Sequence, residues 1–483
     1  MGRVSYGRAL SGRAVEDPDR IAVVFEGASL SRGELERRAN RMARAFRERG
    51  VEPGRLVTIG LPNGFGFIVA CAAAWKCGAI PNPISPRLPA RERDRILALA
   101  DPALVIGFAD LADGSTRLRA DFEPSPALGD APLPDVMSPS ERAMASGGST
   151  GRPKLIVLRN PAEYDADVPA NVLTPRGCVL VPGPLYHAAP FGSLTQGLLA
   201  GETVVLMGRF DASECLALIE RHRVEQVLFV PTMMHRIWRL PEAERKARDV
   251  SSLRLVLTGS APCPAWLMRS FIDWLGPSVM HEVYGGSERI GGTFITGHEW
   301  LEHPGSVGRP IGTTGIRIVD PESGRELPTG EVGEIYMLPA SGPGSTYRYV
   351  GADAQATADG WESVGDMGRL DADGYLYLAD RRTDMILSGG RNIYPAHVEA
   401  AIDEHPAVAS SAVIGLPDDD LGQRVHAIVQ TTRSLSDTEL REHLVSRVIH
   451  YAIPRSFEFV AGPLRDEAGK LRRFALRAER VQG

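Results

Sequence analysis

The chain has 483 residues, of which 43% are hydrophobic and 24% charged, and its formal net charge is -6. This composition is typical of a folded globular protein, and the length allows two to four domains of ordinary size. No run of lysine and arginine stands out, which argues against nucleic acid as the main partner.

The cysteines and the apolar runs exclude further classes. The five cysteines are scattered and none lies in a CxxC pair, so we expect neither a disulfide framework nor a zinc site. The longest apolar run, 65–75, is too short to span a bilayer, and the N-terminus has no apolar signal core. We therefore expect a cytoplasmic protein without a membrane span. For the oligomeric state we expect a monomer or a homodimer.

Helix and strand patterns alternate through the first part of the chain. Apolar residues recur at helical spacing over 31–50, and Gly50 is well placed to end that helix. Short apolar runs near helical segments predict the strands of a largely parallel sheet, and hence an α/β fold. The predicted strands are 57–61, 104–107, 179–181, 203–206, 226–230 and 253–257, and the other predicted helices are 66–77, 211–223 and 264–275.

The pattern changes twice further along the chain. From about residue 315, short strands separated by glycine, proline and aspartate predict a small antiparallel β region. After Asp380, a glycine turn, a helix over 395–404, two strands and a helix over 436–448 predict a small α/β domain. The arginine-rich tail is expected to be helical.

Residues 146–154 read Ser-Gly-Gly-Ser-Thr-Gly-Arg-Pro-Lys, a composition that suits a loop around a polyanion. Glycines let backbone N–H groups approach phosphate oxygens, hydroxyls add donors, and Arg152 and Lys154 add positive charge. The segment is not a Walker A loop, because Pro153 separates Gly151 from Lys154. On composition alone, a solvent-exposed turn is the alternative. The residues that we assign to phosphate binding are Ser146, Gly147, Gly148, Ser149, Thr150, Gly151 and Lys154.

Further short motifs follow this phosphate segment in a fixed order. They lie at 184–187 (PLYH), 259–262 (GSAP), 284–288 (YGGSE), 365–366 (GD), 380–381 (DR), 389–395 (GGRNIYP) and 469–470 (GK). The series resembles the adenylate-forming superfamily, which includes acyl-CoA synthetases, adenylation domains of peptide synthetases and luciferases. The resemblance covers nearly the whole chain and is greatest for the acyl- and aryl-CoA ligase branch.

The resemblance implies a fold and a reaction. The fold is α/β, with a large N-terminal domain of two α/β subdomains plus a small β subdomain, and a small mobile C-terminal α/β domain. We place the boundary in the polar junction near 380–384, so that the domains are 1–380 and 381–483. The cofactors are ATP, Mg2+ and coenzyme A. A carboxylate attacks the α-phosphate of Mg-ATP to give an acyl-adenylate and pyrophosphate, and a thiol, usually that of coenzyme A, then displaces AMP.

The same resemblance assigns residues to the nucleotide and its metal. Glu288 coordinates Mg2+, with Ser287 in place of the usual threonine, and a carboxylate suits such a hard cation. Tyr284 packs on the adenine, or is a buried core tyrosine. Asp366 accepts hydrogen bonds from the ribose hydroxyls, although Val364 replaces a usual threonine just before it. The other residues assigned to the nucleotide are Gly259, Ser260, Ala261, Gly285, Gly286, Arg381, Gly389 and Gly390.

By resemblance, Lys470 bridges the carboxylate and the α-phosphate. Two anions must meet in that step, so one cation lowers the Coulomb barrier. A solvated lysine beside an arginine-rich tail is the alternative. The family rotates its C-terminal domain between the two steps, so that 389–395 replaces Lys470 at the site. Thr383 stands where the family usually has a hinge aspartate or lysine, which leaves open how accessible both states are.

The acid pocket is expected near His187, where CoA ligases have a histidine or an aromatic gate. A satisfied core histidine is the alternative. Amino-acid-activating relatives have an aspartate close by, whereas residues 187–190 read His-Ala-Ala-Pro, which disfavours an α-amino acid. The small residues Gly259, Ser260 and Ala261 would form the pocket floor and leave room for a ring or a chain.

Two arginines keep alternative interpretations. Arg381 contacts the ribose or the phosphates, or forms a surface ion pair with Asp380 or Asp384. Arg289, directly after Glu288, points either inward or outward. Inward, it would pair with a second anionic group or hold a small oxyanion; outward, it is an ordinary surface residue.

The expected function is an AMP-forming, ATP-dependent acid:CoA ligase for an aryl, alicyclic or acyl carboxylate. Its catalytic residues would be Lys470, His187 and Glu288. One alternative is a related enzyme that adenylates nitrite and diazotises an aromatic amine. Another is a stand-alone adenylation enzyme that loads a carrier protein. A non-catalytic nucleotide sensor is disfavoured, because the phosphate segment and the acidic and basic motif residues are all present.

Overall fold

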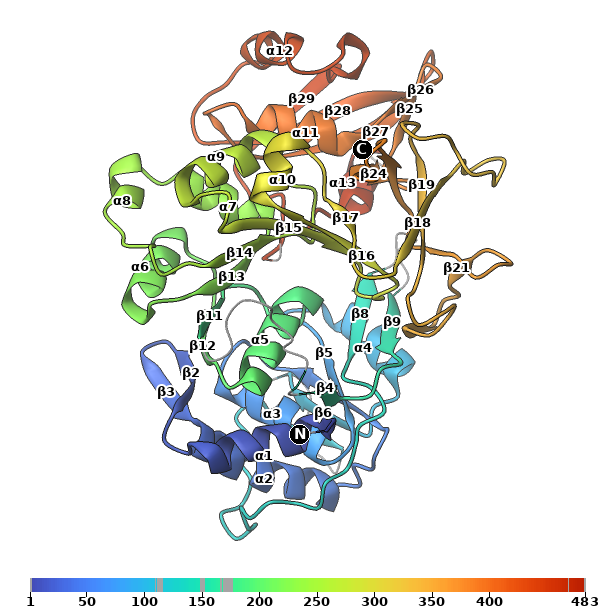
Figure 1. Cartoon of the computed structure of the whole chain (residues 1–483). Helices are drawn as coiled ribbons and strands as arrows, with labels where there is room; N and C mark the ends of the chain where they lie inside the picture. Colours follow the sequence, from blue (N-terminus) through green and yellow to red (C-terminus); the bar gives the residue numbers. More distant parts are fainter. Residues whose placement is uncertain are drawn as a thin grey trace.

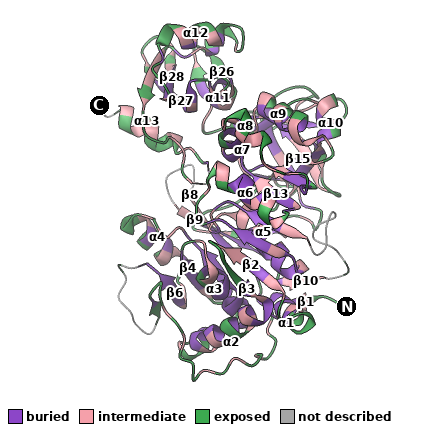
Figure 2. Ribbon diagram, turned by 90° about the vertical axis from the view of Figure 1, so that its left-hand side faces the viewer, coloured by how far each residue is buried: buried purple, intermediate pink, exposed green. Residues whose placement is uncertain are grey.

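The structure is a computed structural model that describes residues 2–108, 110, 116–147, 153–165, 167, 177–467 and 469–481. Figure 1 shows a large N-terminal part, coloured from blue to yellow, and a smaller orange-to-red C-terminal domain at the opposite end from the N-terminus. Buried residues concentrate in the sheets and on the helix faces that pack against them (Figure 2). The predicted α/β class with one large and one small domain is confirmed.

A nine-stranded sheet occupies the centre of the N-terminal part. Its strands are β2 (Ile21–Phe25), β3 (Ala28–Ser31), β11 (Cys178–Val181), β12 (Thr203–Leu206), β13 (Gln226–Phe229), β14 (Leu255–Thr258), β15 (Met280–Gly285), β16 (Gly292–Thr296) and β17 (Arg309–Pro310). The order is β17-β16-β15-β14-β13-β11-β12-β2-β3, and the strands from β15 to β2 in this order pair in parallel. The pairing confirms the predicted parallel sheet.

Helices cover both faces of this sheet. Successive residues of a strand point to opposite faces, so neighbouring strand residues pack into different buried clusters. Val179 and Val181 belong to one buried cluster, whereas Leu180 belongs to a second. The helices in this part are α5 (Ala188–Ala200), α6 (Ala212–His222), α7 (Pro231–Trp238), α8 (Glu242–Lys246), α9 (Ala265–Leu275) and α10 (Gly297–Glu302).

A second, four-stranded parallel sheet lies nearer the N-terminus. It consists of β5 (Ile80–Pro83), β4 (Leu56–Gly60), β6 (Leu104–Gly107) and β7 (Arg117–Leu118), in that order. The helices beside it are α1 (Tyr6–Glu16), α2 (Arg32–Glu48), α3 (Phe65–Lys76) and α4 (Ala90–Ala100). Ser31 caps α2 by accepting a hydrogen bond from the backbone N–H of Glu34, and Gly50 follows the helix with φ +82°, as predicted.

The phosphate segment is flanked by two strands that were not predicted. β8 (Ala143–Gly147) and β9 (Pro153–Leu158) pair antiparallel, and β9 pairs with the distant β20 (Tyr347–Val350). Of the residues assigned to phosphate binding, Gly148, Ser149, Thr150 and Gly151 lie outside the described residues. Two further short strands, β1 (Val4–Ser5) and β10 (Glu163–Tyr164), also pair antiparallel.

An antiparallel sheet follows, as predicted for the region after residue 315. It contains β18 (Gly315–Val319), β19 (Gly333–Leu338), β21 (Gln355–Ala356), β22 (Glu362–Ser363), β23 (Asp366–Leu370) and β24 (Leu376–Arg381). Its last strands place Asp366 and Arg381 opposite one another.

The C-terminal domain packs around its own buried cluster, which begins at Ile386. Its elements are β25 (Ile386–Ser388), β26 (Arg391–Ile393), α11 (Pro395–Asp403), β27 (Val408–Asp418), β28 (Gly422–Thr431), α12 (Asp437–Val445), η1 (His450–Ala452), β29 (Ser456–Val460) and α13 (Arg473–Val481). Because β24 still belongs to the preceding sheet, the chain passes between the domains over 382–385. The division into 1–380 and 381–483 remains our proposal. Among the described helices, none is both long and apolar enough to cross a membrane.

Candidate active site

A cavity of about 2680 Å³ lies between the N-terminal part and the C-terminal domain, and both contribute to its lining. Pockets for one small ligand typically measure about 300–1,000 Å³, so this cavity has room for more than one. The predicted site residues that line it are Ser146, Lys154, His187, Ser260, Ala261, Tyr284, Gly285, Gly286, Ser287, Glu288, Asp366, Arg381 and Lys470. Residues that are far apart in the sequence therefore meet at one cavity.

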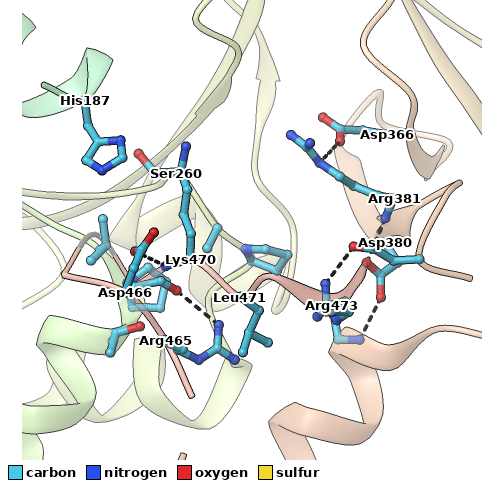
Figure 3. A pocket seen from close by; sticks show the side chains of 18 of the residues that line it. His187, Ser260, Asp366, Asp380, Arg381, Arg465, Asp466, Lys470, Leu471 and Arg473 are labelled. Carbon is cyan, nitrogen blue, oxygen red and sulfur yellow. Dashed lines mark hydrogen bonds and ion pairs between the residues drawn. The ribbon is translucent and has the colours of Figure 1, made fainter. Parts of the chain in front are cut away.

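Asp366 is the centre of one polar group on the cavity wall. The Tyr284 hydroxyl donates a hydrogen bond to Asp366 Oδ2 at 2.8 Å, and Arg381 Nε lies 3.3 Å from Asp366 Oδ1 (Figure 3). Arg381 thus pairs with Asp366 rather than with either neighbouring aspartate considered above. Burial raises the pKa of the Asp366 carboxyl, and the Arg381 guanidinium opposes that rise. The carboxylate is fixed in place by its partners, as an acceptor for a diol needs to be.

Glu288 forms a second polar group with Lys154 and Tyr349. The Tyr349 hydroxyl donates to Glu288 Oε1 at 2.6 Å, and Lys154 Nζ lies 3.7 Å from the same oxygen and 3.7 Å from the centre of the Tyr349 ring. Burial lowers the pKa of Lys154, although the Glu288 carboxylate opposes this. A Cβ at Gly286 would come within 2.9 Å of Glu288 Oε2, so the glycine keeps that oxygen open.

This open carboxylate oxygen fits a single Mg2+ ligand, because Mg2+ is usually held by one or two carboxylates together with phosphate oxygens and water. Within the described part of the chain, no group of three or more histidine, cysteine, aspartate and glutamate residues could bind a metal by itself. Glu288 therefore suits an ion that arrives with a phosphate ligand.

The floor of the cavity bends sharply after β14. A Cβ at Gly259 would lie 2.5 Å from the carbonyl oxygen of Val283, so only glycine fits there without a shift of the backbone. Ser260 has φ +67°, a left-handed conformation that costs about 1–2 kcal/mol for residues other than glycine. Such strain persists only where the surrounding structure holds it, and it is common at ligand sites.

Lys470 reaches the cavity from the C-terminal domain. It lies in a tight turn, in which its backbone N–H donates to Asp466 Oδ1 at 2.9 Å. The neighbouring Gly469 (φ +76°) allows the turn to lie against the N-terminal part, since a Cβ there would be 2.6 Å from Thr232 Oγ1. The Lys470 side chain extends toward Ser260 and His187 (Figure 3). Desolvation by the cavity walls lowers the pKa of Lys470, and so does the Arg381 charge.

His187 stands at the start of α5, with its ring centre 4.7 Å from that of Tyr186. Burial, together with the nearby Lys470 charge, lowers the pKa of His187 to about 3. The imidazole is therefore neutral at physiological pH. It can accept or donate one hydrogen bond to a ligand, but it brings no positive charge.

Exposed ion pairs join the turn of Lys470 to the N-terminal part. Glu467 pairs with Arg87 and accepts a long hydrogen bond, 3.4 Å, from the Tyr186 hydroxyl. Arg472 Nη1 lies 3.4 Å from Glu92 Oε2. Ion pairs of this exposed kind contribute about 0–1 kcal/mol each.

The other side of the turn is tied firmly to the C-terminal domain and to the junction. Arg473 donates to both oxygens of the buried Glu399, at 3.2 and 2.8 Å, and its Nη1 lies 2.8 Å from Asp384 Oδ2. Bidentate pairs between arginine and a carboxylate fix geometry more strongly than single contacts.

Comparison with known proteins agrees with this arrangement. Residues 10–350 match the AMP-binding enzyme family, and residues 397–470 match the AMP-binding enzyme C-terminal domain. The chain is 35% identical over 465 residues to a feruloyl-CoA synthase of Amycolatopsis sp, covering 92% of this chain and 93% of the relative. It is 31% identical over 482 residues to a 2-succinylbenzoate–CoA ligase of Bacillus licheniformis, covering 97% and 98%. The chain belongs to the family of AMP-binding enzymes.

Solved relatives share the arrangement of the whole chain. The o-succinylbenzoate CoA synthetase of Bacillus subtilis, in complex with an acyl-adenylate intermediate, has a TM-score of 0.81 at 26% identity, covering 99% of both chains. The same synthetase with ATP and a magnesium ion has a TM-score of 0.80 at 25% identity and covers 100% of both chains. The large and small domains of this AMP-binding enzyme therefore have close structural counterparts.

Two predicted glycines of this AMP-binding enzyme are not brought to the cavity. Gly389 and Gly390 form the exposed turn between β25 and β26, with φ of +55° and +74°, and they are absent from the cavity lining among the described residues. Gly259 lies under the cavity floor rather than on it, and Gly147 ends β8 beside the segment 148–152. The turn at 389–390 contributes nothing to the site in this domain arrangement.

The structure also shows that Arg289, whose direction the sequence left open, belongs to a charged group whose other members sequence reasoning missed. Arg289 turns toward Glu141 and donates to both of its carboxylate oxygens, at 2.9 and 2.8 Å. Arg142 donates to Glu141 as well. The adjacent Glu141 and Arg142, placed directly before an apolar strand, were the available sequence signal. Their partners are too distant in the chain for a local pattern to reveal.

Proposed function

We propose that this AMP-binding enzyme is an ATP-dependent ligase that joins a carboxylic acid to coenzyme A through an acyl-adenylate. The observation that carries the proposal is the position of Lys470, which enters from one domain the cavity where the other domain presents Glu288 and Asp366. Two of the relatives are named as CoA ligases of aryl acids, which supports an aryl or acyl carboxylate as the substrate.

ATP would lie along the wall formed by the two polar groups. Asp366, held by Tyr284 and Arg381, would accept hydrogen bonds from the ribose hydroxyls. Lys154 and Ser146, at the two ends of the phosphate segment, would donate to the β- and γ-phosphates. Glu288 would hold Mg2+, which supplies positive charge to the phosphate oxygens when bound.

In the first step, the acid carboxylate would attack the α-phosphate and pyrophosphate would leave. Lys470 would place its ammonium between the two anions, where a preorganised cation in a poorly hydrated site is most effective. The neutral His187, near the end of the Lys470 side chain, would form part of the acid pocket without adding charge. We assign Lys470 as the residue that the first step cannot lack.

In the second step, the coenzyme A thiol would attack the acyl carbonyl and AMP would leave. We propose that the C-terminal domain turns about the junction at 382–385, withdraws Lys470 and brings Gly389 and Gly390 to the cavity. The exposed ion pairs that seat the turn of Lys470 are weak enough to be exchanged in each cycle.

The test is ATP–pyrophosphate exchange across a panel of aryl, alicyclic and straight-chain acids, followed by mass detection of the thioester when coenzyme A is added. We expect exchange with at least one class of acid, and a thioester with equimolar AMP only in the presence of coenzyme A. Absence of exchange with every acid would refute the proposal.

Two further arms separate the alternatives. Nitrite with an aminoaryl acid replaces the carboxylate and coenzyme A in one arm, and a phosphopantetheinyl carrier protein replaces coenzyme A in the other. Faster pyrophosphate release with nitrite than with any carboxylate would favour a diazotase. Preferential loading of the carrier would favour a stand-alone adenylation enzyme.

A further inference from the structure

Two arginines and one glutamate form a charged cluster on the cavity wall where β8 begins, and two of the three residues are buried. Glu141 and Arg142 are only 5% and 3% exposed. Glu141 Oε1 accepts from Arg142 and from Arg289 at 2.8 Å, and Oε2 accepts from Arg289 at 2.9 Å and from the Tyr6 hydroxyl at 3.0 Å. Both arginines line the cavity.

The cluster carries one more positive charge than negative charge. The Glu141 carboxylate already accepts four hydrogen bonds, about as many as its lone pairs allow, so it has no capacity left. Burial lowers the pKa of Arg142 to about 10, so its guanidinium group remains charged at neutral pH. Burial also raises the pKa of Tyr6, which therefore stays neutral. An uncompensated charge in such a place is costly unless a ligand supplies the opposite charge.

Arg142 has an unused donor at this wall. Its Nε is buried and has no hydrogen-bond partner among the described residues. A buried donor left unpaired is unfavourable, and a ligand acceptor would satisfy it. Its guanidinium carbon lies 5.9 Å from the centre of the Phe191 ring, which places the group beside α5, the helix that also provides Ala188, Ala189 and Gly192 to the cavity.

Arg289 is held toward the cluster by a strained backbone. Its φ of +53° is left-handed, which is unfavourable for a bulky residue, and its N–H donates to the Gly286 carbonyl oxygen at 3.1 Å. Although Arg289 is paired with Glu141, its side chain remains 38% exposed, and it lines the cavity. It therefore has donor capacity left for a ligand.

We propose that the acid activated by this enzyme carries a second carboxylate, which Arg142 and Arg289 bind at the far end of the acid pocket. This inference rests on the proposed function. Arg142 directly precedes β8 and Ser146 lies near its end, and both line the cavity; four residue steps of a strand span about 13 Å. Because the arginine side chains take up part of this span, an aromatic ring or a short alkyl chain between the two carboxylates fits what is left. The small residues Ala188, Ala189 and Gly192 of α5 line the cavity and provide apolar surface for such a spacer.

The test compares matched pairs of acids that differ only in the distal carboxylate. Suitable pairs are 3-phenylpropanoate with 3-(4-carboxyphenyl)propanoate, and hexanoate with hexanedioate. The readout is kcat/KM for ATP–pyrophosphate exchange, expressed as the ratio of diacid to monoacid. We expect this ratio to exceed tenfold for at least one pair in the unsubstituted protein.

Substitution of Arg289 tests whether this residue causes the preference for the diacid. Arg289→Gln should lower the ratio at least tenfold, mainly through KM for the diacid, and Arg289→Lys should retain part of it. Arg223→Gln is the matched control, because Arg223 has a similar φ of +51° and a carboxylate partner, Asp249 at 2.8 Å, outside the cavity lining. In that control the ratio should not change.

The outcomes separate this inference from the proposed function. Exchange with acids but a diacid-to-monoacid ratio below tenfold for every pair, or equal ratios in Arg289→Gln and the unsubstituted protein, would overturn the inference alone. Absence of exchange with every acid would overturn both. The ratio measured in the unsubstituted protein decides the matter even if Arg289→Gln does not fold.

Discussion

The two sides of the cavity are built in different ways. On the N-terminal side, Asp366 and Glu288 each accept a hydrogen bond from a tyrosine side chain, Tyr284 of β15 and Tyr349 of β20. On the C-terminal side, Lys470 arrives on a turn whose contacts with the N-terminal part are mainly exposed ion pairs and a glycine. In the proposed mechanism, the nucleotide is held through both steps, whereas Lys470 acts only in the first. The firmly hydrogen-bonded side thus carries the residues proposed for both steps, and the weakly attached side carries the residue proposed for the first step alone.

The largest expected effect comes from removing the lysine. Lys470→Ala should lower pyrophosphate release by about 10²–10³-fold, the loss typical of one donor that stabilises developing charge. Thioester formation from a supplied acyl-adenylate should be largely retained. The two half-reactions are measured separately, by pyrophosphate release and by coenzyme A consumption. Unchanged pyrophosphate release would remove Lys470 from the mechanism.

Asp366→Asn should slow both steps, because Asp366 lies on the N-terminal side of the cavity, which is proposed to hold the nucleotide in each step. Loss of a hydrogen bond to a charged group costs about 1.5–3 kcal/mol, which is roughly a ten- to hundredfold loss of kcat/KM. Asp373→Asn is the matched control, since Asp373 is exposed and lies outside the cavity lining. A loss confined to the first step in Asp366→Asn would contradict the proposed difference between the two sides of the cavity.

The smallest effect is expected from the contacts that seat the turn of Lys470. The double variant Arg87→Ala and Arg472→Ala removes two exposed ion pairs, each worth at most about 1 kcal/mol. Pyrophosphate release should fall modestly, and the thioester step should not fall. High salt should reproduce the change in the unsubstituted protein, because it screens exposed charges. A loss as large as that of Lys470→Ala would show that these ion pairs are essential for holding the turn of Lys470 against the N-terminal part.

Local patterns were sufficient to predict most of the elements that form the parallel sheet. The strands 104–107 and 203–206 have the bounds predicted, and the helix that Ser31 caps lies within the predicted range. Their periodicity and end signals are properties of neighbouring residues. The pairing of β9 with β20 could not be predicted in this way, since its register depends on residues from distant parts of the chain.

The same distinction between local and long-range information applies to the candidate site. Most of the site residues that the ordered motifs identified line the cavity, including Lys470 and Glu288. They did not identify the partners of those residues. Arg381 pairs with Asp366 because two adjacent strands place them opposite one another, and Glu141 meets Tyr6 and Arg289 only after the chain folds.

In the proposed cycle, the ion pairs of Arg473 bear on how fast the enzyme can turn over. Only two residues separate Arg473 from Lys470, and it pairs with Glu399 of α11 and with Asp384 of the junction. In that cycle, the Lys470 ammonium group would leave the cavity with the C-terminal domain rather than by a nanosecond loop fluctuation of its own. Rigid-body rotations of domains take about microseconds to milliseconds. The proposed exchange would then set an upper bound on the turnover number, whichever acid is bound.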